Sequence, residues 1–141
     1  MKEGSSSLLQ AGDVFKHEFS FTQDGVAQFA QVTGDTNPVH LDQEYAAKTI
    51  FKKPIMHGFL GGSIFSKVFG TLFPGEGTIY LRQNMQFKKP MYVDKSYEAV
   101  FTVKEVNAEK HKAIIETRIV DKENNDITIE GEAEVMNRTR I

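Results

Sequence analysis

A chain of 141 residues, with 40% hydrophobic and 26% charged residues, has the length and composition of one globular domain with a single core. Its formal net charge of -2 gives no basic excess, so we expect neither a nucleic-acid nor a membrane partner. The absence of cysteine excludes disulfides, thiolate metal sites and a cysteine nucleophile. Four histidines without a His-x-x-x-His spacing argue against zinc, and we expect no metal. The polar start has no apolar run of signal-peptide length, which predicts a cytoplasmic protein.

The first part of the chain predicts a loose end followed by a strand. We expect a flexible N-terminus over residues 1–10 and a single domain over residues 11–141. Residues 13–21 alternate between apolar and polar side chains, which predicts a half-buried strand whose phenylalanines face the core. His17 falls on the phenylalanine face, and we expect it to be a packed core histidine.

Two helices are expected next. Thr22 is placed to cap a helix that runs from Gln23 to Thr33. The residues expected to form its inward stripe are Val26, Phe29, Ala30 and Val32. A second, short helix is expected over residues 42–48, with Tyr45 and Ala46 turned inward.

The segment between these helices brings an acid, an amide, a proline and an imidazole together, in the order Thr33-Gly34-Asp35-Thr36-Asn37-Pro38-Val39-His40. Gly34 permits unusual backbone angles, and Pro38 prevents the first helix from continuing. We therefore predict a bent loop in which Asp35 and His40 can converge. A carboxylate and an imidazole in one pocket are what proton transfer near neutral pH requires. On these residues alone, it is an equal alternative that Asp35 or Asn37 caps the next helix and that His40 is a satisfied loop histidine.

Residues 57–73 form a strongly apolar run in which Lys67 is the only charged residue. Apolar side chains cover most of the helix circumference, which predicts a buried helix that is too short and too interrupted to span a bilayer. Gly61, Gly62 and Ser63 lower the helix propensity, and we expect another backbone or a ligand to approach closely there. The segment Pro74-Gly75-Glu76-Gly77 ends the helix.

The rest of the chain is predicted to be β-structure. Strand-like runs occupy residues 78–88, 96–106, 113–121 and 127–136. A polar turn at residues 122–126 predicts that the last two strands form a hairpin. The expected fold class is α+β, with a curved antiparallel sheet wrapped around one long buried helix. An uncovered sheet face or edge needs a partner, so we expect a homodimer.

The string from Phe29 to His40, followed by Ala46, and the later string Pro54-Ile55-Met56-His57-Gly58 are similar to motifs of a known family. They resemble the MaoC-like, (R)-specific enoyl-CoA hydratases, and above all the small hydratases linked to polyhydroxyalkanoate synthesis. The resemblance extends over about residues 13–136. It implies a hot dog fold, a homodimer and no cofactor.

The resemblance also implies a reaction, the reversible addition of water to a trans-2-enoyl-CoA to give an (R)-3-hydroxyacyl-CoA. Asp35 and His40 would form the dyad that activates the water, with the division of acid and base roles left open. Asn37 would orient the water or brace the turn. The backbone N–H of Gly58, at the positive end of the buried helix, is the candidate donor to the thioester oxyanion. His57 is assigned to structure.

A further set of side chains is expected near the substrate: Ser63, Lys52, Lys53, Arg82, Lys88 and Lys89. The cations would meet the phosphates of coenzyme A, although a lysine pair is more commonly just a solvated surface. One alternative function is a 3-hydroxyacyl-acyl-carrier-protein dehydratase. Another is a non-catalytic acyl-CoA-binding hot dog protein, which would be expected to have lost Asp35 or His40.

Overall fold

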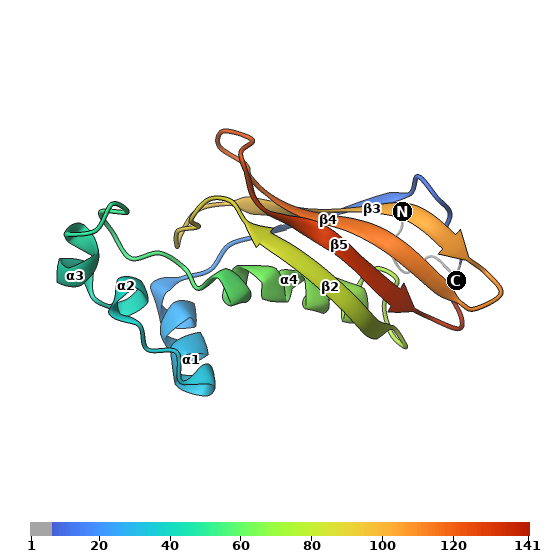
Figure 1. Cartoon of the computed structure of the whole chain (residues 1–141), viewed down its shortest axis with the longest axis horizontal. Coiled ribbons are helices and arrows are strands. Elements are labelled where there is room, and N and C mark those ends of the chain that lie inside the picture. Colours follow the sequence, from blue (N-terminus) through green and yellow to red (C-terminus); the bar gives the residue numbers. More distant parts are fainter. Residues whose placement is uncertain (1–6) are drawn as a thin grey trace.

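The computed structural model describes residues 7–141, in which a short strand is followed by a helical segment, one long helix and four longer strands (Figure 1). The elements are β1 (Val14–Phe19), α1 (Gln23–Thr33), α2 (Pro38–Leu41), α3 (Gln43–Ala47), α4 (Gly58–Thr71), β2 (Ile79–Phe87), β3 (Tyr97–Asn107), β4 (Lys112–Asp121) and β5 (Ile127–Met136). The predictions of α1 and of the four long strands are confirmed, with every end within one residue of its expected place.

All five strands form one sheet in the order β1-β3-β4-β5-β2, and every neighbouring pair is antiparallel. The predicted hairpin of β4 and β5 is therefore confirmed. The sheet has two edges, β1 and β2. Helix α4 runs along one face of the sheet, whereas α1, α2 and α3 lie beyond one end of it (Figure 1).

The core lies between α4 and the face of the sheet that this helix covers. Phe65 and Phe69 of α4 are fully buried, and their ring centroids lie 5.8 and 5.3 Å from that of Phe101 on β3. The alternation predicted along β5 is also present, because Ile129 and Val135 are buried while the glutamates between them remain partly exposed. This α+β arrangement is the hot dog fold that the resemblance implies.

Helix α4 is buried on one side only within the chain. Its exposed residues include Phe59, Ser63, Ser66, Lys67 and Gly70, whose spacing of three or four positions places them on one side of the helix. The close approach expected at the two glycines is made by side chains rather than by a backbone. A Cβ at Gly62 would lie 2.7 Å from the sulfur of Met85.

Three orientations differ from the prediction. Val32 is 86% exposed, because it lies two positions after the buried Ala30 and so points away from the core. Tyr45 is half exposed, since α3 is a single short helix that buries only Ala46. His17 is half-buried rather than packed in the core, and its Nε2 lies 3.0 Å from Nζ of Lys67.

The predicted flexible N-terminus falls partly outside the described residues, because residues 1–6 are not described. Within the part that is described, Leu9 is buried and its N–H donates to the carbonyl of Arg140. No helix within residues 7–141 combines the length and the apolar character needed to cross a bilayer.

Candidate active site

The segment that carries Asp35 and His40 bends as predicted, although its second half is helical. Gly34 ends α1 with a φ of 82°, a left-handed conformation that glycine adopts without strain, and its N–H donates to the carbonyl of Ala30. Pro38 then begins α2, because the first position of a helix needs no N–H donor and suits the fixed φ of proline. The predicted loop over residues 35–40 is therefore wrong from Pro38 onwards, where α2 carries His40 back toward Asp35.

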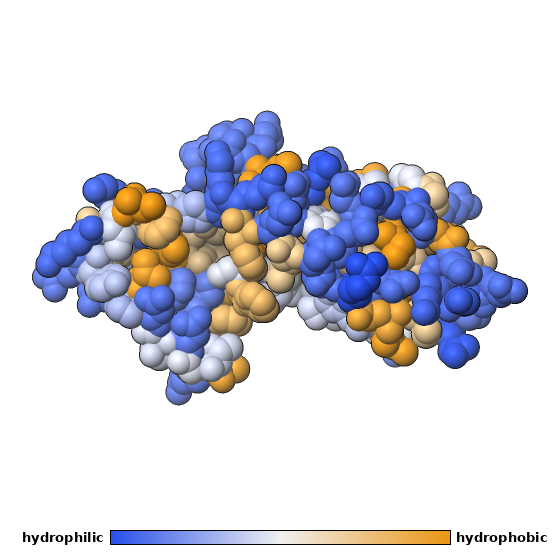
Figure 2. Space-filling view, viewed as in Figure 1, coloured by the Kyte–Doolittle hydropathy of each residue, from blue (hydrophilic) through white to orange (hydrophobic). Residues whose placement is uncertain are grey.

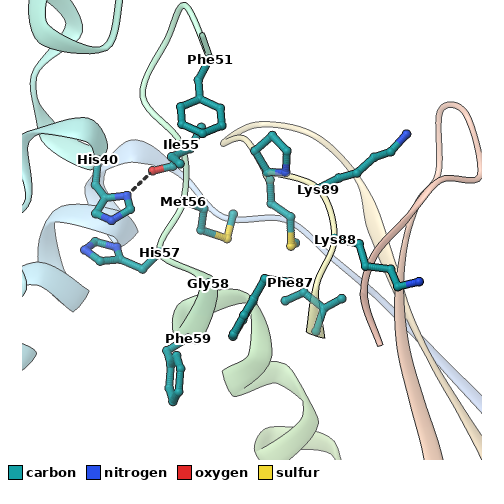
Figure 3. A pocket seen from close by; sticks show the side chains of 13 residues that line it. His40, Phe51, Ile55, Met56, His57, Gly58, Phe59, Phe87, Lys88 and Lys89 are labelled. Carbon is teal, nitrogen blue, oxygen red and sulfur yellow. Dashed lines mark hydrogen bonds between the residues drawn. The ribbon is translucent and has the colours of Figure 1, made fainter. Parts of the chain in front are cut away.

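His40 is buried, with 8% of its surface exposed. Its Nδ1 lies 2.7 Å from the carbonyl oxygen of Ile55 (Figure 3). A carbonyl can only accept, so Nδ1 carries the proton and the neutral ring keeps the lone pair on Nε2. The backbone carbonyl of His40 also accepts a hydrogen bond from the side chain of Gln23 in α1. The ring is thus held in the tautomer that a general base requires.

Asp35 is exposed. A carboxylate oxygen of Asp35 and one ring nitrogen from each of His40 and His57 all lie within 4.8 Å of one another. The structure therefore brings the predicted dyad together. The imidazoles of His40 and His57 are stacked, with centroids 3.8 Å apart and planes 30° apart. Ligand lone pairs lie in the ring plane, and near-parallel rings do not converge on one ion at the 2.0–2.1 Å of a zinc–histidine bond. This arrangement suits proton transfer better than metal binding.

Asn37 supports the turn. It is the N-cap of α2, and its side-chain oxygen accepts a hydrogen bond of 3.1 Å from the N–H of Val39. Its own N–H donates to the carboxylate of Asp35 at 3.4 Å. Of the two roles considered for Asn37, these contacts favour bracing the turn that carries the acid.

Gly58 is the first residue of α4, where backbone N–H groups have no acceptor within the helix and the helix dipole is positive. A Cβ at this position would lie 2.7 Å from the ring of Phe87. Glycine has no Cβ, so it allows this ring to pack against the start of the helix. An N–H at this site can stabilise a developing negative charge on a carbonyl oxygen.

A pocket of about 460 Å³ connects His40 and Gly58 with an apolar interior (Figure 3). Its lining is mainly apolar: Phe51, Ile55, Met56, Phe59, Phe87, Pro90, Met91 and Ile129. Lys88 and Lys89 also line it. A cavity of this size, with a few polar groups at one point, fits the acyl part of a small ligand. Two of the lining residues, Phe59 and Phe87, are exposed. Hydrophobic surface is visible where the molecule narrows between the helices and the sheet (Figure 2).

The remaining candidate residues are divided between two places. Ser63 and Arg82 do not line this pocket but a neighbouring groove between α4 and β2. The hydroxyl of Ser63 donates to the carbonyl of Leu60, as a small residue on a helix commonly does. Lys52 and Lys53 lie in the loop that follows Phe51 of the pocket.

The candidate cations also differ in whether they form ion pairs. Arg82, Lys88 and Lys89 form ion pairs with Glu134, Glu130 and Asp126, at 3.9, 3.0 and 2.9 Å. For Lys52 and Lys53 there is no ion pair within residues 7–141. The ammonium of Lys53 instead lies over the ring of Tyr92, 4.7 Å from its centroid. The lysine pair at positions 52 and 53 is therefore the better candidate to meet a phosphate.

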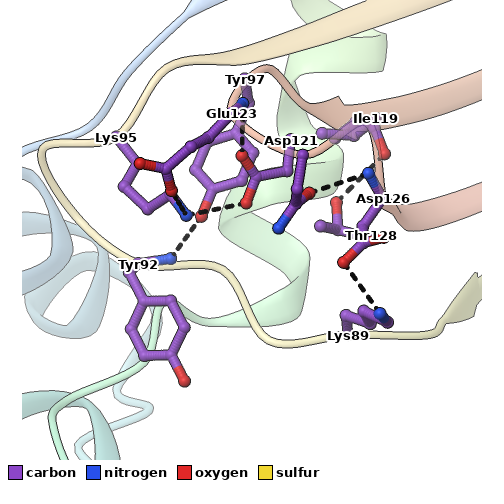
Figure 4. A network of polar contacts seen from close by, with 10 residues as sticks. Lys89, Tyr92, Lys95, Tyr97, Ile119, Asp121, Glu123, Asp126 and Thr128 are labelled. Carbon is purple, nitrogen blue, oxygen red and sulfur yellow. Dashed lines mark hydrogen bonds and ion pairs between the residues drawn. The ribbon is translucent and has the colours of Figure 1, made fainter.

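A polar network holds the 88–96 loop that forms one wall of the pocket (Figure 4). Lys95 donates to the carboxylates of Asp121 and Glu123 at 2.8 and 3.1 Å. The hydroxyl of the buried Tyr97 accepts from the N–H of Tyr92. Burial by itself raises the pKa of Asp121, but the hydrogen bonds from Lys95 and from the amide of Glu123 outweigh it and hold that pKa below its usual value.

Asp121→Asn is expected to lower the free energy of unfolding at pH 7 by roughly 1–3 kcal/mol, because it leaves Lys95 without its main partner. A carboxyl whose pKa is lower in the folded state stabilises the fold above its unfolded pKa, and this contribution is lost as pH falls below about 4. The difference between wild type and variant should therefore shrink below that pH in urea unfolding curves.

Asp126→Asn is the matched control, because Asp126 lies at the same β4–β5 turn as Asp121. The change removes an exposed ion pair with Lys89. It should change the free energy of unfolding by less than about 1 kcal/mol. Equal losses in the two variants would contradict a special role for Asp121.

Sequence reasoning missed how close one residue lies to the dyad. His57, which is expected to have a structural role, has its Nε2 3.0 Å from the carbonyl oxygen of Asp35, and its ring stacks on that of His40. The string Pro54-Ile55-Met56-His57-Gly58 was the signal that marked this position. Nothing in the sequence indicated that Phe87, from β2, would meet the start of α4.

Comparisons with known proteins agree with this fold. A family model described as MaoC like domain matches residues 8–126. The chain is 37% identical to the (R)-specific enoyl-CoA hydratase of Aeromonas caviae, covering 93% of this chain and 97% of that protein. It is 30% identical to a mitochondrial 3-hydroxyacyl-[acyl-carrier-protein] dehydratase of Arabidopsis thaliana, covering 92% and 78%. The solved structure of the A. caviae (R)-hydratase involved in PHA biosynthesis, with 37% identity, matches with a TM-score of 0.87 over 92% of this chain and 97% of that one. The chain therefore belongs to the MaoC-like family.

Proposed function

We propose that this protein catalyses the reversible, (R)-specific hydration of trans-2-enoyl-CoA to (R)-3-hydroxyacyl-CoA. The observation that carries the proposal is that the side chains of Asp35 and His40 converge, while His40 and Gly58 line the same apolar pocket. The similarity to hydratases of that name, over nearly the whole of both chains, supports it.

In this mechanism Asp35 and His40 hold one water molecule between them. One member of the dyad takes a proton from the water as its oxygen bonds to C3 of the enoyl group. A proton is then delivered to C2, so that the elements of water are added across the double bond and no other reactant is needed. The thioester oxygen gains negative charge during the addition, and the N–H of Gly58 is placed to stabilise it.

The first experiment is to follow the loss of enoyl-thioester absorbance with crotonyl-CoA and to determine the chirality of the product. Formation of (R)-3-hydroxybutyryl-CoA is expected. Turnover only with acyl-carrier-protein substrates would favour the dehydratase alternative. Binding of acyl-CoA without turnover of either substrate would favour the non-catalytic alternative.

Lys52 and Lys53 are proposed to meet the phosphates of coenzyme A. Replacing both by Ala should raise KM for crotonyl-CoA about three- to tenfold, because two exposed charge pairs are lost, with little change in kcat. The increase should vanish with a crotonyl thioester of N-acetylcysteamine, which has no phosphate. The control replaces Lys110 and Lys112, which lie at the β3–β4 turn, and it should leave KM unchanged. An equal effect on both thioesters would argue against phosphate contact.

A homodimer is proposed through the β2 edge. β2 is the last strand in the sheet, so within residues 7–141 no strand pairs with its outer edge, and it exposes Ile79, Tyr80, Leu81 and Phe87. The exposed stripe of α4 lies beside it, around the groove that contains Phe59 and Leu81. A second copy that pairs with β2 would extend the sheet and cover this groove.

Leu81→Asp is expected to convert the dimer to a monomer, measured by light scattering after size-exclusion chromatography, because it places a charge on the proposed interface. Leu81 is 42% exposed in the single chain, so the fold should tolerate the change. Val32→Asp, on the exposed side of α1, is the control and should remain dimeric. A dimer that survives Leu81→Asp would place the interface elsewhere.

A further inference from the structure

We propose that His57 is a positioning residue that aligns Asp35, His40 and the N–H of Gly58 with one another. The inference rests on the proposed function, because it concerns the same reaction. It assigns a role in turnover to a side chain that the acid–base mechanism does not itself use.

The first observation is that His57 does not cap its own helix. It occupies the N-cap position of α4, yet its side chain makes no cap hydrogen bond. Its Nε2 instead lies 3.0 Å from the backbone carbonyl oxygen of Asp35, 22 residues earlier in the chain. Because that oxygen is an acceptor, Nε2 is the protonated nitrogen. This hydrogen bond ties the Asp35 turn directly to the start of α4.

The second observation is the stack of two imidazoles. The ring of His57 contacts both the ring of His40, with centroids 3.8 Å apart, and the ring of Phe29, with centroids 4.8 Å apart. The stack fixes the plane of the His40 ring, while the bond to Ile55 fixes its tautomer (Figure 3). Both the direction and the position of the Nε2 lone pair of His40 are then determined.

The third observation is that His57 is only 3% exposed, and its Nδ1 is buried without a hydrogen-bond partner among the described residues. A buried unpaired nitrogen is unfavourable, so packing alone would be served better by an apolar ring. A flat ring with one edge donor is what the site uses: the face packs on His40 and the edge holds Asp35. The next residue is Gly58, whose N–H belongs to the peptide bond that follows His57. The position of His57 therefore also sets the position of this N–H relative to Asp35 and His40.

Reactive groups misplaced by about 1 Å can lose on the order of 10²-fold in rate. His57→Phe retains the flat ring and removes the donor, and we expect kcat to fall by about 10- to 100-fold while KM changes less than about threefold. His57→Gln places an amide donor near the position of Nε2, and it should recover part of the lost kcat. A role in general packing would instead favour the Phe variant over the Gln variant.

The matched control is His111→Phe. His111 also holds a main-chain oxygen, that of Ile141, through its Nδ1 at 2.6 Å, but it lies at the β3–β4 turn, away from the site. This variant makes the same chemical change and should keep kcat and KM. Wild-type values of kcat in His57→Phe, alongside an active wild type, would overturn the inference.

Two further measurements do not depend on turnover, and the first of them needs no variant. Long-range ¹H–¹⁵N NMR of the wild-type protein should show His57 as the Nε2–H tautomer, and a protonated Nδ1 would overturn the inference. Amide hydrogen exchange at residues 35–37 should be faster in His57→Phe than in wild type, and unchanged exchange there would also overturn it. An inactive wild type that gives the expected NMR and exchange results would contradict the proposed function alone.

Discussion

Asp35→Asn is expected to reduce kcat for hydration of crotonyl-CoA by about 10³-fold, with KM little changed. An amide has nearly the same shape as a carboxylate and still offers an oxygen to the N–H of Asn37, so the turn should persist. It cannot take a proton from water, and general acid–base groups contribute roughly 10²–10⁴ in rate. Steady-state kinetics with the enoyl-thioester absorbance measures the effect.

Asp42→Asn is the matched control for this variant. Asp42 caps α3 by accepting a hydrogen bond from the N–H of Tyr45, and asparagine caps helices equally well. The same chemical change seven residues further along should therefore leave kcat unaltered. If Asp35→Asn kept kcat within tenfold of wild type, Asp35 would not be the acid–base group.

His40→Asn is expected to lower kcat by a similar factor, about 10³-fold. The amide nitrogen of asparagine lies close to the place of Nδ1, so it can still donate to the carbonyl of Ile55. The variant has no atom at the position of Nε2, so it loses the base while it retains the hydrogen bond to Ile55. The stack on His57 is also lost, so circular dichroism at the assay temperature should accompany the kinetics.

His40→Gln makes the opposite exchange, because its amide reaches the position of Nε2 but not that of Nδ1. An amide is not a base, and this variant should be as inactive as His40→Asn. Substantial activity in His40→Gln would mean that His40 only holds the water by a hydrogen bond. In that case Asp35 alone would perform the proton transfers.

The closeness of Asp35 and His40 could be predicted from sequence because it depends on the local backbone. Gly34 ends one helix and Pro38 starts the next, so the chain between them is short and must turn back on itself. The interacting groups therefore lie within six residues, and no distant contact is needed to bring them together. The strands were predictable for a related reason, since burial of one sheet face imposes a two-residue period.

Side-chain direction in short helices was less predictable. Tyr45 and Val32 are exposed although their positions were expected to face inward. In a helix of five residues, or at the last turn of a longer one, a single pattern of apolar residues defines the buried side poorly. Whether such a residue meets the core depends on where the helix is docked, which sequence spacing does not specify.

What the sequence by itself determined is the order and type of the long elements, and the acid and imidazole that belong to one site. The tertiary structure alone decided which candidate cations form ion pairs, because Glu130 and Glu134 reach Lys88 and Arg82 only through the pairing of β2 with β5. It also decided the contacts of His57, which meets Asp35 and His40 across 22 and 17 positions of the chain. Such contacts depend on how α4 packs against the sheet and against the turn before α2, and no local pattern encodes that packing.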